Sequence, residues 1–194
     1  MAIPWLSSVK DTGQLTVHNQ LRSGGWVHVF KAALQLFNGL GLPVKMSQAK
    51  DEASANVLMR VASGLPTYDY NNTTYSSPNP FDPKRLHGYT MLVHVQGRPV
   101  EKAVVFLPSD PQYDAGFIRG RQIFEKANLN MMKIIAVHEL IHACGLENKD
   151  HADDGVFAAN VTPQNGKLVA WGQVRAMPPL FLAQSTVAKV ASLW

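Results

Sequence analysis

Residues 138–151, with the sequence HELIHACGLENKDH, constrain the fold of this chain more than any other stretch. His138 and His142 lie four positions apart, and Glu139 directly follows the first histidine. On an α-helix, residues at this spacing lie one turn above each other on the same face. Both imidazoles can therefore reach one metal ion, while Glu139 lies about 100° further around the helix, beside an open position on the metal.

The residues around this motif indicate a buried helix. The preceding run 131–137, MMKIIAV, is strongly apolar. Positions that recur with the spacing of a helical core stripe are Ile134, Val137, Ile141 and Cys144. Unpaired imidazoles in so apolar a setting would be costly to bury, and a bound metal ion would offset that cost. A solvated helix that carries the motif by accident is the alternative, and it does not explain the apolar run.

Extended through Gly145, the motif resembles the H-E-x-x-H-x-x-G-x-x-H signature of the metzincin clan of zinc peptidases. The resemblance implies that the glycine turns the chain and that a third histidine returns to the metal. Here Asn148 occupies the position of that ligand, and an amide is a poor zinc ligand. The expected third ligand is His151, three residues later, after a short insertion. Asp150 is the alternative, because a carboxylate oxygen also binds zinc; water or Asn148 remains open as well.

A methionine in a tight turn beneath the metal is the second metzincin feature, and Met177 is its candidate. It lies in the segment 175–179, RAMPP, downstream of the histidines. The resemblance implies that its thioether packs under the ligand imidazoles. An ordinary core methionine beside a turn is the alternative. The clan often carries a tyrosine just behind this methionine that stabilises the transition state; residues 178–181 contain none, so that role has no candidate.

The expected fold is α+β and metzincin-like, with one catalytic domain over residues 1–194. It combines a twisted mixed β-sheet, a backing helix and the active-site helix in an N-terminal subdomain, about 1–145. A small C-terminal subdomain, about 146–194, holds the Met-turn and a C-terminal helix. Patterning predicts strands at 15–18, 44–46, 55–61, 89–96 and 102–107, and helices at 23–38, from Asn130 onwards and at 185–193.

Four further segments carry expectations. Residues 102–107 are expected, from the family layout, to form the edge strand along which a substrate lies. Residues 67–83 are expected to form a long irregular loop beside the cleft. Residues 121–125 form either a short strand or the start of the metal-site helix. A hairpin is expected around residues 164–166.

Composition limits the partners. With 46% hydrophobic and 16% charged residues, the chain is globular rather than disordered. The net charge of +4 is scattered without a Lys/Arg run, which argues against nucleic acid as a partner.

Cys144 is the only cysteine, so no intrachain disulfide can form, and it is expected to be a core residue. No signal peptide or membrane span is recognised. We expect a monomer without a membrane partner, cytoplasmic as written, with non-classical export or phage association left open.

The expected function is that of a zinc endopeptidase acting on a protein or peptide. One Zn²⁺ would be held by His138, His142 and His151, and Glu139 would act as general base towards a metal-activated water. One alternative is a zinc hydrolase of cell-wall peptide or amide bonds in a phage or toxin system. Another is a non-catalytic zinc-binding module; Glu139 argues against it, because a structural site fills its fourth position with protein and needs no base.

Two secondary roles complete the expected site. A carboxylate should orient one of the ligand histidines, and the candidates are Asp150, Asp153 and Asp154. Side-chain preference is expected to come from a pocket behind Met177, lined by Leu180 and Phe181.

Overall fold

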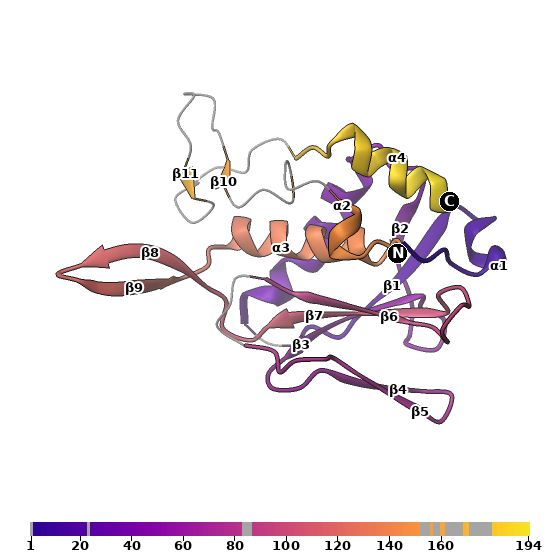
Figure 1. The fold of residues 1–194 in the computed structure, drawn as a ribbon, viewed down its shortest axis with the longest axis horizontal. Coiled ribbons are helices and arrows are strands. Elements are labelled where there is room, and N and C mark those ends of the chain that lie inside the picture. Colours follow the sequence, from indigo (N-terminus) through magenta and orange to yellow (C-terminus); the bar gives the residue numbers. More distant parts are fainter. Residues whose placement is uncertain are drawn as a thin grey trace.

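The computed structural model describes residues 2–22, 24–82, 87–151, 156, 160–161, 169–170 and 180–194 (Figure 1). A five-stranded mixed sheet is its frame, in the order β2-β1-β3-β7-β6. The strands are β1 (Gln14–Asn19), β2 (Lys45–Gln48), β3 (Val57–Ala62), β6 (Tyr89–Val93) and β7 (Lys102–Pro108). Neighbours are parallel except for β6, which runs antiparallel to β7. The expected α+β class with a mixed sheet is therefore confirmed.

The strand predicted to form the sheet edge lies inside the sheet instead. All seven residues of β7 are buried, and the strand lies between β3 and β6. Residues 94–101 connect β6 to β7. Strand β6 pairs with the side of β7 that faces away from β3. The edge strand on this side is therefore β6, and the expectation for residues 102–107 was wrong.

The longer helices lie on one face of the sheet (Figure 1). The helical segments are α1 (Ser7–Lys10), η1 (Gly24–His28), α2 (Phe30–Asn38), α3 (Leu129–His142), η2 (Asn148–Asp150) and α4 (Gln184–Leu193). The backing helix α2 buries Phe30, Ala33, Leu34 and Phe37, an i, i+3, i+4, i+7 stripe that packs in the main core. The predicted single helix from Ser23 is divided into η1 and α2, and Ser23 itself lies outside the described residues.

A β-hairpin covers the opposite face, where a long irregular loop was predicted. It consists of β4 (Thr67–Tyr70) and β5 (Thr73–Ser76), paired antiparallel. Asn71 and Asn72 form its turn with φ values of 47° and 61°. Both central residues of this turn are left-handed, a conformation that asparagine tolerates. Tyr68 packs with sheet residues in the second core cluster, so the hairpin is held by its aromatic side chains.

A second hairpin extends away from the body of the molecule (Figure 1). It consists of β8 (Gln112–Ile118) and β9 (Arg121–Lys126). Of the two predictions for residues 121–125, the strand is confirmed and the helix start is wrong. No sequence pattern predicted β8, whose pairing is interrupted by a bulge between Asp114 and Gly116.

The C-terminal helix α4 begins within one residue of its predicted start. The short strands β10 (Asn160–Val161) and β11 (Val169–Ala170) pair antiparallel, as a hairpin requires, while the predicted turn at 164–166 lies outside the described residues. Met177 also lies outside them, so the Met-turn and the subdomain division stay predictions. No described helix is long and apolar enough to cross a membrane.

Candidate metal centre

The site is built on α3, whose two ends are fixed by specific residues. At its start, the Asn128 side chain accepts hydrogen bonds from the main-chain N–H groups of Asn130 and Met131, at 2.9 and 3.0 Å. The N-cap is therefore Asn128, two residues before the predicted Asn130. At the other end Gly145 turns the chain with φ +106°, as predicted. A Cβ at Gly145 would also clash with the Ile3 carbonyl, so this turn requires glycine.

The helix is buried on nearly all sides. The predicted stripe of Ile134, Val137, Ile141 and Cys144 is buried in the main core. Cys144 is fully buried, and this burial raises the pKa of its thiol far above the usual range. The single cysteine is thus a core residue, as its place in the stripe predicted.

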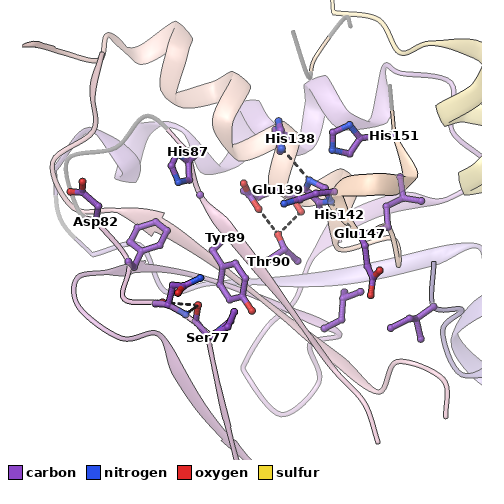
Figure 2. A pocket seen from close by; sticks show the side chains of 18 of the residues that line it. Ser77, Asp82, His87, Tyr89, Thr90, His138, Glu139, His142, Glu147 and His151 are labelled. Carbon is purple, nitrogen blue, oxygen red and sulfur yellow. Dashed lines mark hydrogen bonds between the residues drawn. The ribbon is translucent and has the colours of Figure 1, made fainter. Parts of the chain in front are cut away.

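Three histidines converge beside this helix (Figure 2). Nε2 of His138 and Nε2 of His142 lie 3.1 Å apart. The ring centre of His151 lies 5.8 Å from that of His138 and 5.0 Å from that of His142. One ligand nitrogen from each of the three lies within 4.8 Å of the others. A tetrahedral metal with bonds of about 2.0–2.1 Å separates its ligand nitrogens by about 3.4 Å, so this group could hold a metal ion with small adjustments.

Main-chain carbonyl groups orient the two helical histidines. Nδ1 of His142 lies 3.0 Å from the carbonyl oxygen of Leu146. That contact requires a hydrogen on Nδ1, which leaves the lone pair on Nε2 directed to the shared centre. The main chain of Val156 makes the corresponding hydrogen bond to His138. The role expected of a carboxylate is therefore filled at both positions by the backbone.

Burial keeps these imidazoles neutral. Desolvation, followed by the charge of His142, lowers the pKa of His138 to about 3. Desolvation also lowers the pKa of His142 to about 4, although the bond to Leu146 opposes it. A neutral imidazole offers a lone pair to a metal ion without first losing a proton. Both residues are thus prepared as ligands at neutral pH.

The segment after Gly145 brings His151 to the other two histidines. Residues 148–150 form η2, a single 3-10 turn, and His151 is its C-cap. The Asp150 carboxylate closes this turn by accepting the Glu147 N–H at 3.2 Å, and its other oxygen lies 3.9 Å from Lys189 Nζ. Asp150 therefore stabilises the turn, and His151 is the residue of this segment that joins His138 and His142 in the group that could hold a metal ion. Asp153 and Asp154 lie outside the described residues.

Glu139 lies below the histidines, with 3% of its surface exposed. Its Oε2 accepts a hydrogen bond from the Thr90 hydroxyl at 2.7 Å, and the Gly88 main chain also bonds to it. A Cβ at Gly88 would lie 2.5 Å from Cγ of Glu139, so the carboxylate fits only against glycine. Burial raises the pKa of Glu139 to about 7, against the lowering effect of these two bonds.

A cleft of about 980 Å³ opens over these residues. Its walls are the end of α3, the edge strand β6, and the segment 77–82, which belongs to the stretch expected to border it. Thr90, Leu92 and His94 line it from alternate positions at the sheet edge. Leu180 and Phe181 are not among its described lining residues: Leu180 packs against the core, and Phe181 is 61% exposed. The segment 171–179 lies outside the described residues, so the specificity pocket expected behind Met177 stays a prediction.

Thr90 and Gly88 are the site residues that sequence reasoning missed. A glycine two positions before a threonine at the start of a strand is the only local signal, and it does not indicate Glu139 as the partner. No protein-family model matches this chain, and no curated protein is significantly similar to it. The site thus combines three imidazoles that could hold a metal ion with a buried carboxylate in an open cleft.

Proposed function

We propose that the protein is a zinc-dependent endopeptidase of the metzincin type. The observation that carries the proposal is the convergence of His138, His142 and His151 in one cleft with the buried carboxylate of Glu139. Three imidazoles suit zinc among the common divalent ions, and a catalytic zinc site has three protein ligands with one open position. A zinc ion there would supply a Lewis acid for the scissile carbonyl and lower the pKa of a bound water.

Glu139 is the general base in this proposal. It takes a proton from the attacking water, whose oxygen adds to the carbonyl carbon, and passes that proton to the leaving amine as the C–N bond breaks. A base works best when its pKa is near the working pH, and burial raises the pKa of Glu139 to about 7. Thr90 and Gly88 hold the carboxylate from the side of the sheet, which fixes its direction before a substrate arrives.

The turn after α3 supports the metzincin assignment despite the departure at Asn148. One turn of a 3-10 helix takes about three residues. The insertion relative to the family pattern is the same length, and residues 148–150 are folded as that one turn. The chain can therefore absorb the insertion locally, and His151 takes the role that the family gives to the third histidine.

The edge strand β6 supports a peptide as substrate. It borders the cleft on the same side as Glu139, and its pairing with β7 leaves its outer edge towards the cleft. An extended peptide can add to such an edge through main-chain hydrogen bonds. Its scissile bond would then lie beside the three histidines.

The test pairs metal analysis with digestion of a broad peptide library. We expect about one zinc per chain, as the three-ligand site requires, and internal cleavage of peptides. Glu139→Gln should keep the zinc and lose cleavage, while Glu101→Gln, a carboxylate outside the cleft, should change neither. Casein and purified peptidoglycan are assayed in parallel. Cleavage of peptidoglycan alone would move the assignment to a cell-wall hydrolase, and zinc binding without hydrolysis would reduce it to a binding module.

A further inference from the structure

The tip of the β8–β9 hairpin exposes large apolar side chains that the metal site does not use. Phe117 is 71% exposed, Ile118 63% and Phe124 55%. These are among the most exposed apolar side chains of the described residues, and they lie at the end of the chain segment that projects furthest from the sheet (Figure 1). Clustered exposure of this kind marks an interaction site more often than single scattered residues do.

The apolar side chains occupy both faces of the hairpin. Paired residues of an antiparallel ladder share a face, and the face alternates along each strand. Phe117 pairs with Gln122, which places it on the face of Phe124. Ile118 pairs with Arg121, which places it on the face of Ile123. A protein groove that covered one face would leave the other in water, whereas a fluid apolar medium can take up both.

The same tip is positively charged. Arg119 and Arg121 lie at the turn, and no acidic residue occurs from position 115 to position 124. Both arginines are exposed, and neither forms an ion pair within the described part of the chain. Arg119 has φ +51° and precedes Gly120 at φ +76°, in a turn where asparagine or aspartate would be less strained. The fold alone gives no reason for arginine there.

We propose that this tip, residues 117–124, docks on an anionic membrane surface. The phenylalanine and isoleucine side chains would enter the boundary between headgroups and acyl chains, about 5–10 Å deep, while the arginines bind lipid phosphate and carboxylate groups. Nucleic acid fits the tip less well, because a phosphate backbone is usually met by more than two cations and isoleucine has no stacking surface. This contact is peripheral and independent of the proposed hydrolysis.

The test uses the whole protein and vesicles of phosphatidylcholine with or without phosphatidylserine. We expect sedimentation with the anionic vesicles only, weakening as salt is added. Phe117→Ser with Ile118→Ser should lower the partition coefficient at least about tenfold, because two of the three exposed apolar anchors are lost. Arg119→Glu with Arg121→Glu should lower it by a similar factor. The control is Leu65→Ser with Val95→Ser. These two apolar residues are 51% and 52% exposed but lie off the hairpin, so their replacement should leave binding unchanged.

A second readout locates the contact. Because Cys144 is buried, an environment-sensitive fluorophore can be attached selectively to Ile118→Cys. Its emission should shift to the blue with anionic vesicles, and the same label on Leu65→Cys should not respond. Absence of sedimentation, or sedimentation unaffected by the hairpin variants, would overturn the proposal. If the protein does not bind vesicles but dimerises through the tip, the tip is an interface with a second copy. If it binds an oligonucleotide through the tip instead, the tip is a nucleic-acid site; either result would overturn the proposal.

Discussion

The Thr90 hydroxyl lies 2.7 Å from Oε2 of Glu139 and 2.9 Å from the main-chain oxygen of the same residue. The two residues are 49 positions apart in the chain, one on the edge strand β6 and the other on α3. This contact joins the strand that borders the cleft to the proposed general base. It makes the direction of the carboxylate depend on how the sheet packs against the helix.

The first prediction concerns this hydroxyl. Thr90→Val keeps the shape of the side chain but removes its donor, and a hydrogen bond to a charged group contributes about 1.5–3 kcal/mol. We expect kcat for a peptide substrate to fall about tenfold or more, with KM and zinc content nearly unchanged. Thr90→Ser restores the donor and should recover most of the loss. Equal kcat values for the valine and serine variants would show that Thr90 only fills space.

The second prediction concerns Gly88. A Cβ at this position would lie 2.5 Å from Cγ and 2.9 Å from Cδ of Glu139. We expect Gly88→Ala to lower the free energy of unfolding by about 1–3 kcal/mol, as other over-packed sites do, and to displace the carboxylate. In a Glu139→Ala background those two atoms are absent, so the same change should cost less. Denaturant unfolding of all four proteins measures this coupling, and additive effects would refute it.

The third prediction concerns the third metal ligand. His151→Ala should lower zinc affinity strongly, because one of three nitrogen ligands is lost. Asp150→Ala should lower it moderately, since the η2 turn loses its bond to the Glu147 N–H. Asn148→Ala should change it little. Competition against a zinc chelator measures all three affinities, and a larger loss for Asp150→Ala than for His151→Ala would contradict the assignment.

The fourth prediction concerns how the free energy of unfolding of the metal-free protein depends on pH. Folding lowers the pKa values of His138 and His142 from 6.5 to about 3 and about 4, so the stability that these neutral residues contribute is present above pH 6.5 and lost below it. Folding raises the pKa of Glu139 from 4.5 to about 7, which has the opposite effect over an overlapping range. The combined effect of the two histidines on the free energy of unfolding is larger than the opposite effect of the one carboxyl group. The free energy of unfolding should therefore fall between pH 6.5 and pH 4.5.

Replacement of the histidines is the control for this pH dependence. His138→Gln with His142→Gln removes both titrating groups and should flatten or reverse the slope between pH 6.5 and pH 4.5. Denaturant midpoints measured across the range supply the comparison. An equally steep fall in the variant would assign the acid sensitivity to other residues.

The parts of the site that follow from local geometry could be predicted from the sequence. The spacing of His138, Glu139 and His142 determines their positions on a helix, and Gly145 determines where that helix ends. His151 was expected from the metzincin pattern together with the chemistry of zinc ligands. Thr90 and Gly88 could not be predicted in the same way, because their contact with Glu139 depends on the register of β6 against α3. That register is set by tertiary packing and has no local sequence signal.

Two errors in the fold had signals that were misinterpreted. The run KAVVFLP of β7 is apolar almost throughout, which is typical of a strand buried on both faces rather than of an edge strand. The pair Asn71-Asn72 favours a two-residue hairpin turn, but the polar residues around it suggested an irregular loop. For β7, the family layout was given more weight than the apolar run. For residues 67–83, the polar composition was given more weight than the turn signal of the two asparagines.

We propose that one zinc ion and Glu139 together hydrolyse peptide bonds in this cleft. The decisive experiment titrates zinc into the chelated protein while cleavage of a peptide substrate is followed. We expect activity to rise linearly and to stop at about one equivalent of zinc per chain. Glu139→Gln should bind the same equivalent with kcat at least about 10²-fold lower. Cleavage that does not depend on zinc, or a Glu139→Gln variant with near-normal turnover, would contradict the claim.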